Sequence, residues 1–227
     1  MSRPYIVCHM MTSIDGRIDC AMTGQLKGVD EYYKTLDELD TPSRLSGRVT
    51  AELELALKGK FNPKNNEPIG KESFSKKKES KDHEIIVDTK GTLLWDDDSK
   101  YDRHHLIITS EKVTKEYLEY LDSKKISWIS CGKDKINIEK SMEILSKEFN
   151  VKRLAVVGGP LINSSFLDAG LLDEISILIG VGIDGRKGMP GVFDGFTMDH
   201  PITTKLKFKE VKSFDDGAVW IRYTVTK

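Results

Sequence analysis

The sequence predicts an α/β fold with three layers, in which a mainly parallel central sheet lies between helices. Apolar, β-branched runs recur along the chain, and most of them are separated by stretches with apolar residues at helical spacing. Strands that alternate with helices form a parallel sheet covered on both faces. The last two runs are joined only by the turn Asp215-Asp216-Gly217, which predicts a C-terminal antiparallel hairpin.

The predicted elements follow from these patterns in chain order. The strands are expected at 5–11, 84–87, 106–109, 126–130, 154–157, 174–179, 205–211 and 218–225, and a further strand can end before Gly47. The helices are expected at 29–39, 51–57, 113–121, 138–149 and 160–167.

The chain is expected to form one domain over residues 1–227, because its length suits one core and it shows no internal repeat. The polar stretch from about 58 to 84 is interpreted as a solvated surface insertion. It contains the basic run Lys76-Lys77-Lys78, but the acids Glu72, Glu79 and Asp82 are interleaved with it. This mixture argues against a nucleic-acid contact.

Composition excludes several classes of function. The formal net charge is −1, which gives no overall electrostatic attraction to nucleic acid or to an anionic membrane. The cysteines, Cys8, Cys20 and Cys131, are too scattered for a disulfide framework or a zinc site. The histidines lack metal-ligand spacing, and no metal is expected; they are His9, His83, His104, His105 and His200. With no signal peptide or membrane span in the sequence, we expect a cytoplasmic protein.

The most informative stretch joins the apolar run Leu154–Val157 to Gly158, Gly159 and Pro160. Two glycines leave no side chain where the strand ends, and proline suits the first turn of a helix. Such a corner presents main-chain N–H groups to an anion, helped by the helix dipole. The alternative is a tight turn whose glycines serve only packing.

Other candidates follow other strands, since ligands of open α/β sheets gather at the carboxyl ends of strands. Ser13 and Asp15 follow the first strand, Gly47 to Thr50 a possible second, and Thr109 and Ser110 a later one. Standard motifs are absent: no strand leads into G-x-G-x-x-G, and Arg186 stands where a P-loop requires lysine.

Three segments, in this order, resemble the C-terminal reductase domain of riboflavin biosynthesis proteins, a family with the dihydrofolate reductase fold. They are Ser13-Ile14-Asp15-Gly16-Arg17-Ile18, Gly47-Arg48-Val49-Thr50 and Val156-Val157-Gly158-Gly159-Pro160. Asp173-Glu174 and Val192-Phe193-Asp194-Gly195 also look like this family.

The resemblance implies NADPH as hydride donor. A guanidinium at Arg48 would suit the 2′-phosphate of the cofactor, and its alternative role is a surface salt bridge. The cofactor-binding residues implied by the resemblance are Met11, Gly47, Arg48, Thr50, Thr109, Ser110, Gly158, Gly159, Pro160, Leu161 and Ile162.

On the substrate side, His9 and Asp15 are the catalytic candidates, and Ser13, Glu52 and Val157 are the substrate-binding candidates. Three of these residues have an alternative structural role. His9 can be a hydrogen-bonded core histidine, Asp15 a loop-capping carboxylate, and Glu52 a solvent-exposed side chain. The chain departs from related pyrimidine reductases at two positions. They commonly carry lysine at the position of His9 and glutamate at that of Val157, and valine cannot accept a hydrogen bond from a ring N–H.

These features predict an NADPH-dependent reductase of a pyrimidine- or pteridine-like heterocycle, resembling 5-amino-6-(5-phosphoribosylamino)uracil reductase of riboflavin biosynthesis. The alternatives are a dihydrofolate reductase and a noncatalytic NADPH-binding regulatory protein. The expected partners are a small-molecule substrate and, through the apolar strands near the C-terminus, a second copy in a homodimer.

Overall fold

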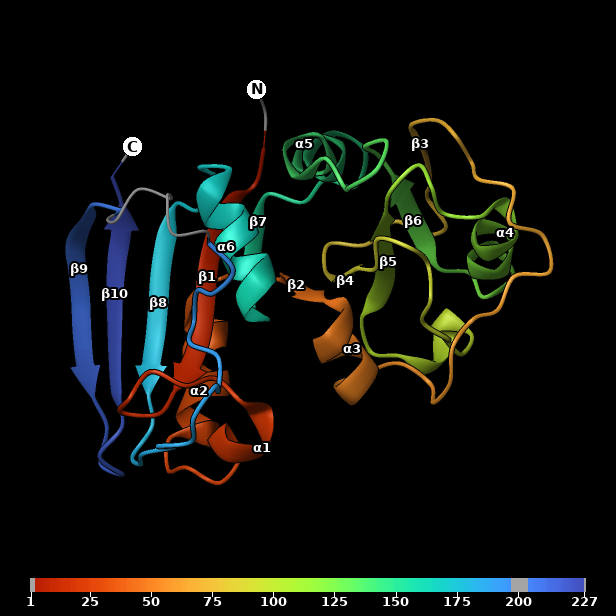
Figure 1. Cartoon of the computed structure of the whole chain (residues 1–227). Coiled ribbons are helices and arrows are strands. Elements are labelled where there is room, and N and C mark those ends of the chain that lie inside the picture. Colours follow the sequence, from red (N-terminus) through yellow and green to blue (C-terminus); the bar gives the residue numbers. More distant parts are fainter. Residues whose placement is uncertain (1–2, 197–203, 227) are drawn as a thin grey trace. The chain divides into compact units, whose positions relative to one another are not determined.

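The computed structural model describes residues 3–196 and 204–226 and has the predicted α/β class (Figure 1). His200 lies outside the described residues. The chain folds into two compact units. The first unit comprises Met1–Pro4 and Pro42–Lys152, and the second comprises Tyr5–Thr41 and Arg153–Lys227. A single domain over residues 1–227 stays a prediction.

The first unit holds five strands in the order β3-β6-β5-β4-β2, all parallel except for β3. Its strands are β2 (Ser43–Gly47), β3 (Ser73–Ser75), β4 (His83–Val87), β5 (His104–Thr109) and β6 (Ser127–Ser130). Its helices are α3 (Arg48–Glu54), α4 (Lys115–Ser123), α5 (Ile138–Glu148) and the short 3-10 helix η1 (Asp98–Lys100).

Alternating strand residues divide the core of the first unit between two faces. On one face Ile86, Ile107 and Trp128 pack with Trp95 and with residues of α3 and α4. On the other face the ring of His83 meets Phe149, directly after α5, edge-on at 5.9 Å. The predicted arrangement of helices on both faces of the sheet is confirmed in this unit.

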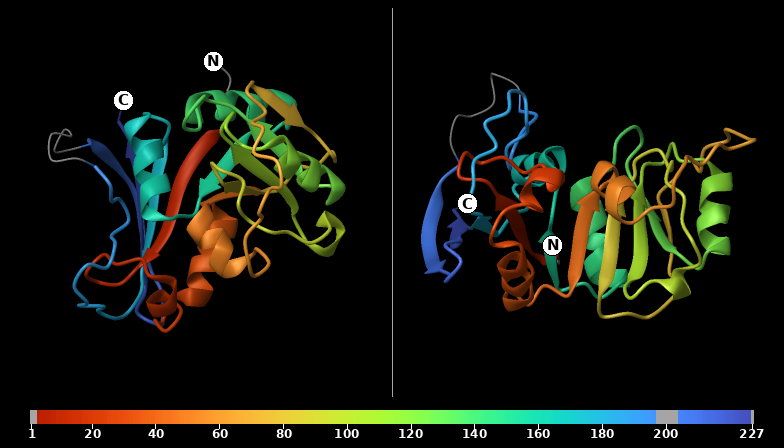
Figure 2. Two further views of the ribbon diagram at one scale, coloured as in Figure 1. Left: turned by 45° about the vertical axis from the view of Figure 1, so that its right-hand side comes forward. Right: turned by 90° about the horizontal axis from the view of Figure 1, so that it is seen from below.

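The second unit holds the strand order β7-β1-β8-β10-β9, in which β7, β1 and β8 are parallel and β10 and β9 form the predicted antiparallel hairpin. The strands are β1 (Tyr5–Thr12), β7 (Arg153–Val156), β8 (Glu174–Ile179), β9 (Leu206–Ser213) and β10 (Val219–Val225). The helices are α1 (Cys20–Thr23), α2 (Val29–Glu38) and α6 (Pro160–Asp168). Figure 2 shows α2 and α6 on opposite sides of β1.

A buried ion cluster ties together the strands of the second unit. The Glu174 carboxylate of β8 is fully buried and accepts hydrogen bonds from Arg222 at 2.5 Å, Lys209 at 2.6 Å and Tyr5 at 3.1 Å. Burial would raise the pKa of Glu174, but the bonds from Arg222 and Lys209 outweigh it and hold that pKa below its usual value. The cluster joins β8 to β10, β9 and β1 at the amino end of the parallel strands.

The structure corrects three sequence predictions. Part of the predicted surface insertion is the strand β3, which pairs with β6 through main-chain bonds that its polar sequence does not signal. Helix α3 begins at Arg48 rather than at residue 51, so Arg48 and Thr50 lie in the helix, not in a turn. Helix α1 was not predicted, because it has only four residues.

Within residues 3–196 and 204–226, no group of three His, Cys, Asp or Glu side chains could hold a metal ion. Among the residues at 3–196 and 204–226, every helix is too short or too polar to cross a lipid bilayer.

Candidate functional site

The glycine corner lies in the second unit, where β7 ends and α6 begins. Gly158 has φ +114°, which L side chains rarely adopt, and Gly159 is the extended residue just before the helix. Pro160 occupies the first turn of α6, as predicted, and no side chain caps that end of the helix. The first helical turn has no earlier carbonyl to bond, so its free N–H groups, on Leu161 and Ile162, are available to a ligand.

The floor of this corner is Met10, which the sequence analysis did not select. A Cβ atom on Gly158 would lie 3.3 Å from the Met10 methyl carbon. The parallel register pairs Cys8 with Val156, so the same alternation brings Met10 beside Gly158. A side chain at position 158 would therefore press on Met10 and fill the corner, which fits close approach of a ligand to bare backbone.

His9 points to the other face of β1 and is held in the core. Its Nδ1 lies 2.8 Å from Ser176 Oγ, its Nε2 lies 3.2 Å from the Tyr32 carbonyl oxygen, and its ring stacks on Tyr32. The indole N–H of Trp220 donates to the same Ser176 oxygen, and because a carbonyl oxygen can only accept, Nε2–H donates to Tyr32. This bonding supports the core interpretation of His9, and the catalytic role stays a prediction.

Met11 lies on the same face of β1 as His9, opposite to the face from which Met10 meets Gly158, because successive strand residues alternate between faces. It is 7% exposed and packs in a core cluster with Val7, Leu39, Leu178 and Trp220. Packing explains this methionine without a cofactor, whose contact with Met11 stays a prediction. Val157, the residue directly before Gly158, is half-buried.

Asp15 joins the loop after β1 to the loop after β8. Its carboxylate accepts a hydrogen bond from the Ser13 hydroxyl at 2.7 Å, from the Asp184 N–H at 2.9 Å and from the Gly185 N–H at 3.0 Å. The bond from Ser13 and then those from the two main-chain N–H groups hold the pKa of Asp15 well below its usual value. A carboxyl that stays ionised cannot donate a proton near neutral pH, which favours the loop-capping alternative.

Ser13 itself is 1% exposed, and it also accepts the Arg17 N–H at 3.1 Å. Its hydroxyl is therefore committed to the turn, and substrate contact through Ser13 stays a prediction.

In the first unit, Gly47 ends β2 and Arg48 opens α3. The Arg48 guanidinium lies 2.6 Å from the Glu52 carboxylate one turn later, and both side chains are about 40% exposed (40% and 39%). An exposed pair of this kind contributes only about 0.3–0.5 kcal/mol, so a phosphate could displace Glu52 at small cost. The structure thus pairs the two candidates with each other and leaves Arg48 reachable from solvent.

Thr109 and Ser110 are buried at the carboxyl end of β5. The Thr109 hydroxyl donates to the Ile129 carbonyl at 3.3 Å, and the Ser110 hydroxyl donates to the Thr89 carbonyl at 3.0 Å. Both hydroxyl protons are used inside the unit, and neither side chain is more than 1% exposed. These bonds support a structural role, and cofactor binding by this pair stays a prediction.

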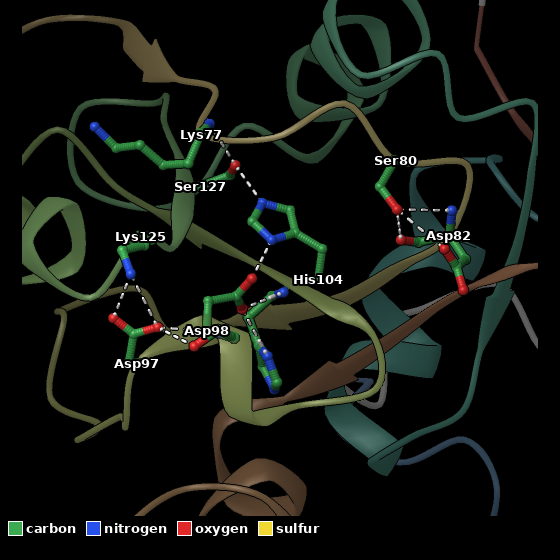
Figure 3. Close-up of polar contacts among 10 residues, drawn as sticks. Lys77, Ser80, Asp82, Asp97, Asp98, His104, Lys125 and Ser127 are labelled. Carbon is green, nitrogen blue, oxygen red and sulfur yellow. Dashed lines mark hydrogen bonds and ion pairs between the residues drawn. The ribbon is translucent and has the colours of Figure 1, made fainter.

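A serine–histidine–aspartate chain lies at the other end of the same strands (Figure 3). His104 bonds Asp98 through Nδ1 and lies 2.8 Å from Ser127 Oγ through Nε2, while the Lys77 N–H donates to Ser127 at 3.0 Å. The order resembles a hydrolase triad, but the three residues His104, Asp98 and Ser127 are 5%, 7% and 0% exposed. A substrate cannot reach Ser127, so this chain fastens strands and loops within the unit.

These features place the protein in the class of α/β proteins with a mainly parallel sheet, a C-terminal antiparallel hairpin and a glycine corner at a strand end. The model of the RibD C-terminal domain family matches residues 4–220. The chain therefore belongs to the RibD C-terminal domain family, which confirms the family resemblance seen in the sequence.

Similar proteins agree with this membership. The chain is 24% identical over 229 residues to the 2,5-diamino-6-ribosylamino-4(3H)-pyrimidinone 5′-phosphate reductase of Archaeoglobus fulgidus, with 97% of this chain and 99% of that protein covered. A pyrimidine reductase-like protein of Corynebacterium diphtheriae superposes with a TM-score of 0.70 at 18% identity, covering 99% and 92% of the two chains. The riboflavin biosynthesis reductase of Saccharomyces cerevisiae gives 0.61 at 17%, covering 99% and 90%. The latter two likenesses establish the fold, which is that of the riboflavin biosynthesis reductases.

Proposed function

We propose that the protein is an NADPH-dependent reductase of a ribosylated pyrimidine-like heterocycle, acting on a C=N, C=O or C=C group. The observation that carries the proposal is the glycine corner, where bare backbone and uncapped helical N–H groups suit a pyrophosphate. Family membership and the name of the archaeal relative support the reductase class and a ribosyl-pyrimidine substrate.

The residues of the corner fit the cofactor on structural grounds. A Cβ on Gly158 would lie 3.3 Å from the Met10 methyl carbon, so glycine leaves free the volume that a side chain would take, and Leu161, in the first turn of α6, is 64% exposed. When bound, NADPH supplies the hydride, and one proton from solvent or an acid completes the reduction of the double bond. In the proposal Gly158, Gly159 and the first turn of α6 hold and orient the pyrophosphate.

Arg48 is proposed as the contact of the cofactor 2′-phosphate, in exchange for its ion pair with Glu52. A charge-assisted bond of this kind contributes about 1.5–3 kcal/mol. Substitution Arg48→Ala should therefore weaken NADPH binding by about ten-fold or more, with NADH binding unchanged within about two-fold. Fluorescence titration with both nucleotides measures this, and Arg103→Ala, which removes another guanidinium of the first unit, is the control. Equal losses of affinity for NADPH and NADH in Arg48→Ala would contradict a contact between Arg48 and the 2′-phosphate.

A noncatalytic NADPH-binding protein is the second candidate, because the hydrogen bonds of His9 and the ionised state of Asp15 leave neither as an evident proton donor. Oxidation of NADPH, followed by absorbance, separates the two candidates when a diaminopyrimidinone, an aminouracil and dihydrofolate are offered in turn. Turnover of a ribosylated pyrimidine supports the reductase, and turnover of dihydrofolate alone points to a dihydrofolate reductase. NADPH binding without any turnover supports the noncatalytic candidate.

A homodimer is part of the proposal and rests on one face of the β8-β10-β9 sheet. Register places Phe208 beside Tyr223, and Val211 beside Ile221, on the face opposite Trp220. Phe208 is 57% exposed and Val211 is 55% exposed, and such an apolar face suits a second copy. Sedimentation of the purified protein measures the oligomeric state.

The location proposed is the cytoplasm. Cys8 and Cys131 are buried free thiols that form no disulfide bond, which suits a reducing compartment.

A further inference from the structure

The loop after β1 and the loop after β8 are fastened together at several points, all within the second unit. The Ile14 N–H donates to the Gly182 carbonyl at 2.8 Å, and the Ile18 N–H donates to the Pro190 carbonyl at 3.2 Å. The Arg17 guanidinium donates to the Met189 carbonyl at 2.6 Å. Main-chain bonds thus run along both loops.

Asp15 lies at the centre of this contact and bonds residues of both loops. Its two carboxylate oxygens take N–H groups from the second loop and the Ser13 hydroxyl from its own loop. Arg186 reinforces the contact, because it bonds Asp184 at 2.6 Å and Asp19 at 2.7 Å. A neutral side chain of the same shape cannot accept all three hydrogen bonds.

The fastened loops leave one apolar side chain uncovered directly beside this contact. Ile14 is 63% exposed although its neighbour Ser13 is 1% exposed and its own N–H is bonded. It follows β1, at the carboxyl end of the parallel strands, where ligands of this fold class bind. An isoleucine held in this way offers a fixed apolar surface to a flat ring.

We propose that Asp15 is a positioning residue, which holds Ile14 as an apolar wall against the heterocycle of the substrate by clamping the two loops together. The proposal rests on the proposed reductase function and assigns Asp15 an indirect role in place of proton donation. Ile14 touches the substrate ring, whereas Asp15 fixes where Ile14 stands. In the proposal the pyrophosphate is held by the glycine corner and not by this clamp.

A double-mutant cycle with Asp15→Asn and Ile14→Ala tests the proposal, using the ribosylated pyrimidine that the wild type turns over. Each single variant should raise KM for the heterocycle by about ten-fold and leave the affinity for NADPH within about two-fold. The double variant should be little worse than either single one, because both changes remove the same wall. Asp30→Asn, at an aspartate in the first turn of α2, is the matched control and should behave as wild type.

Three kinetic results would each overturn the proposal. One is an unchanged KM in Asp15→Asn. Another is a fall in kcat at constant KM with a shifted pH profile, which would mark Asp15 as a proton donor. A third is full additivity of the two substitutions, which would separate Asp15 from Ile14.

Hydrogen exchange at the Asp184 and Gly185 amides keeps the clamp measurable without turnover. Exchange should rise in Asp15→Asn and stay at the wild-type rate in Asp30→Asn and Ile14→Ala. Unchanged exchange in Asp15→Asn would overturn the clamp. A wild type that reduces no heterocycle, with exchange raised in Asp15→Asn, would instead overturn the proposed function and leave Asp15 as a loop clamp alone.

Discussion

The strand ends of the two units differ in the hydrogen-bond donors that they leave available to a ligand. In the first unit the hydroxyls of Thr109 and Ser110 donate to main-chain carbonyls. His104 and Asp98 bond each other in the interior of the unit. In the second unit the corner at Gly158 offers main-chain donors with no side chain to cap them. The comparison indicates that open backbone, more than the presence of polar side chains, marks where a ligand can bind.

The largest effect is expected at the corner itself. Gly158→Val places a branched side chain on a backbone with φ +114° and within 3.3 Å of Met10, so both strain and volume oppose the substitution. NADPH affinity measured by fluorescence titration should fall by about 100-fold or more, equivalent to about 3 kcal/mol. Gly170→Ala is the control, since Gly170 has φ +62° with nothing within 4 Å of its Cβ position. If folded Gly158→Val bound NADPH with wild-type affinity, the open backbone at Gly158 would not be the ligand site that distinguishes the second unit from the first.

A smaller effect, on stability alone, is expected at His83 in the first unit. Burial, with His104 nearby, lowers the pKa of His83 to about 4. The unfolded chain takes up this proton near pH 6.5, so the histidine costs stability as pH falls from about 7 towards 4. Between pH 7 and pH 5 the loss should be about 2 kcal/mol, seen as the difference between wild type and His83→Leu in urea unfolding.

The difference between the two proteins is the quantity to measure, because Glu84 acts in the opposite direction. Burial raises the pKa of Glu84 to about 7. Protonation of this carboxyl therefore increases the free energy of unfolding as pH falls from about 7 to about 4.5. Wild type and His83→Leu both carry Glu84, so its contribution cancels in the difference between their free energies of unfolding. Parallel pH curves for wild type and His83→Leu would show that His83 is not buried as a neutral ring.

The smallest effect is expected for Ser110→Ala. The change removes the hydroxyl's bond to the Thr89 carbonyl, which still accepts the Ser110 N–H at 3.1 Å, and the long bond from the Lys112 N–H at 3.4 Å. The free energy of unfolding should fall by about 1 kcal/mol, with NADPH affinity within about two-fold of wild type. Ser123→Ala, at an exposed hydroxyl near the end of α4, controls for loss of a surface hydrogen bond. A five-fold or greater loss of NADPH affinity in Ser110→Ala would make Ser110 a cofactor residue, as the sequence suggested.

Much of the fold is predictable because its strands are apolar runs and its longer helices carry a clear apolar spacing. The sheet of the second unit and the corner at Gly158 follow directly, since glycine and proline specify backbone conformation locally. The strand at Ser73–Ser75 was missed because three residues are too few to show an alternation of apolar side chains, and a single sequence does not show its main-chain pairing with β6.

The side chains of the site were harder to predict than the corner. Whether His9 or Met10 faces the glycines depends on strand register, which a single sequence does not specify. The main-chain partners of Asp15 in the second loop lie 169 and 170 residues further along the chain. No local sequence pattern predicts them. The exposure of Ile14 follows from those same distant contacts.

The position of Met10 beneath Gly158 has a consequence for how such a protein could diversify. The shape of the corner depends on the thioether of the neighbouring strand as well as on the glycines. Substitution of Met10 by a shorter or branched side chain would change the depth and shape of the glycine corner. The main-chain donors of the corner would stay in place. Ligand preference could thus drift through a residue that shows only 7% of its surface to solvent.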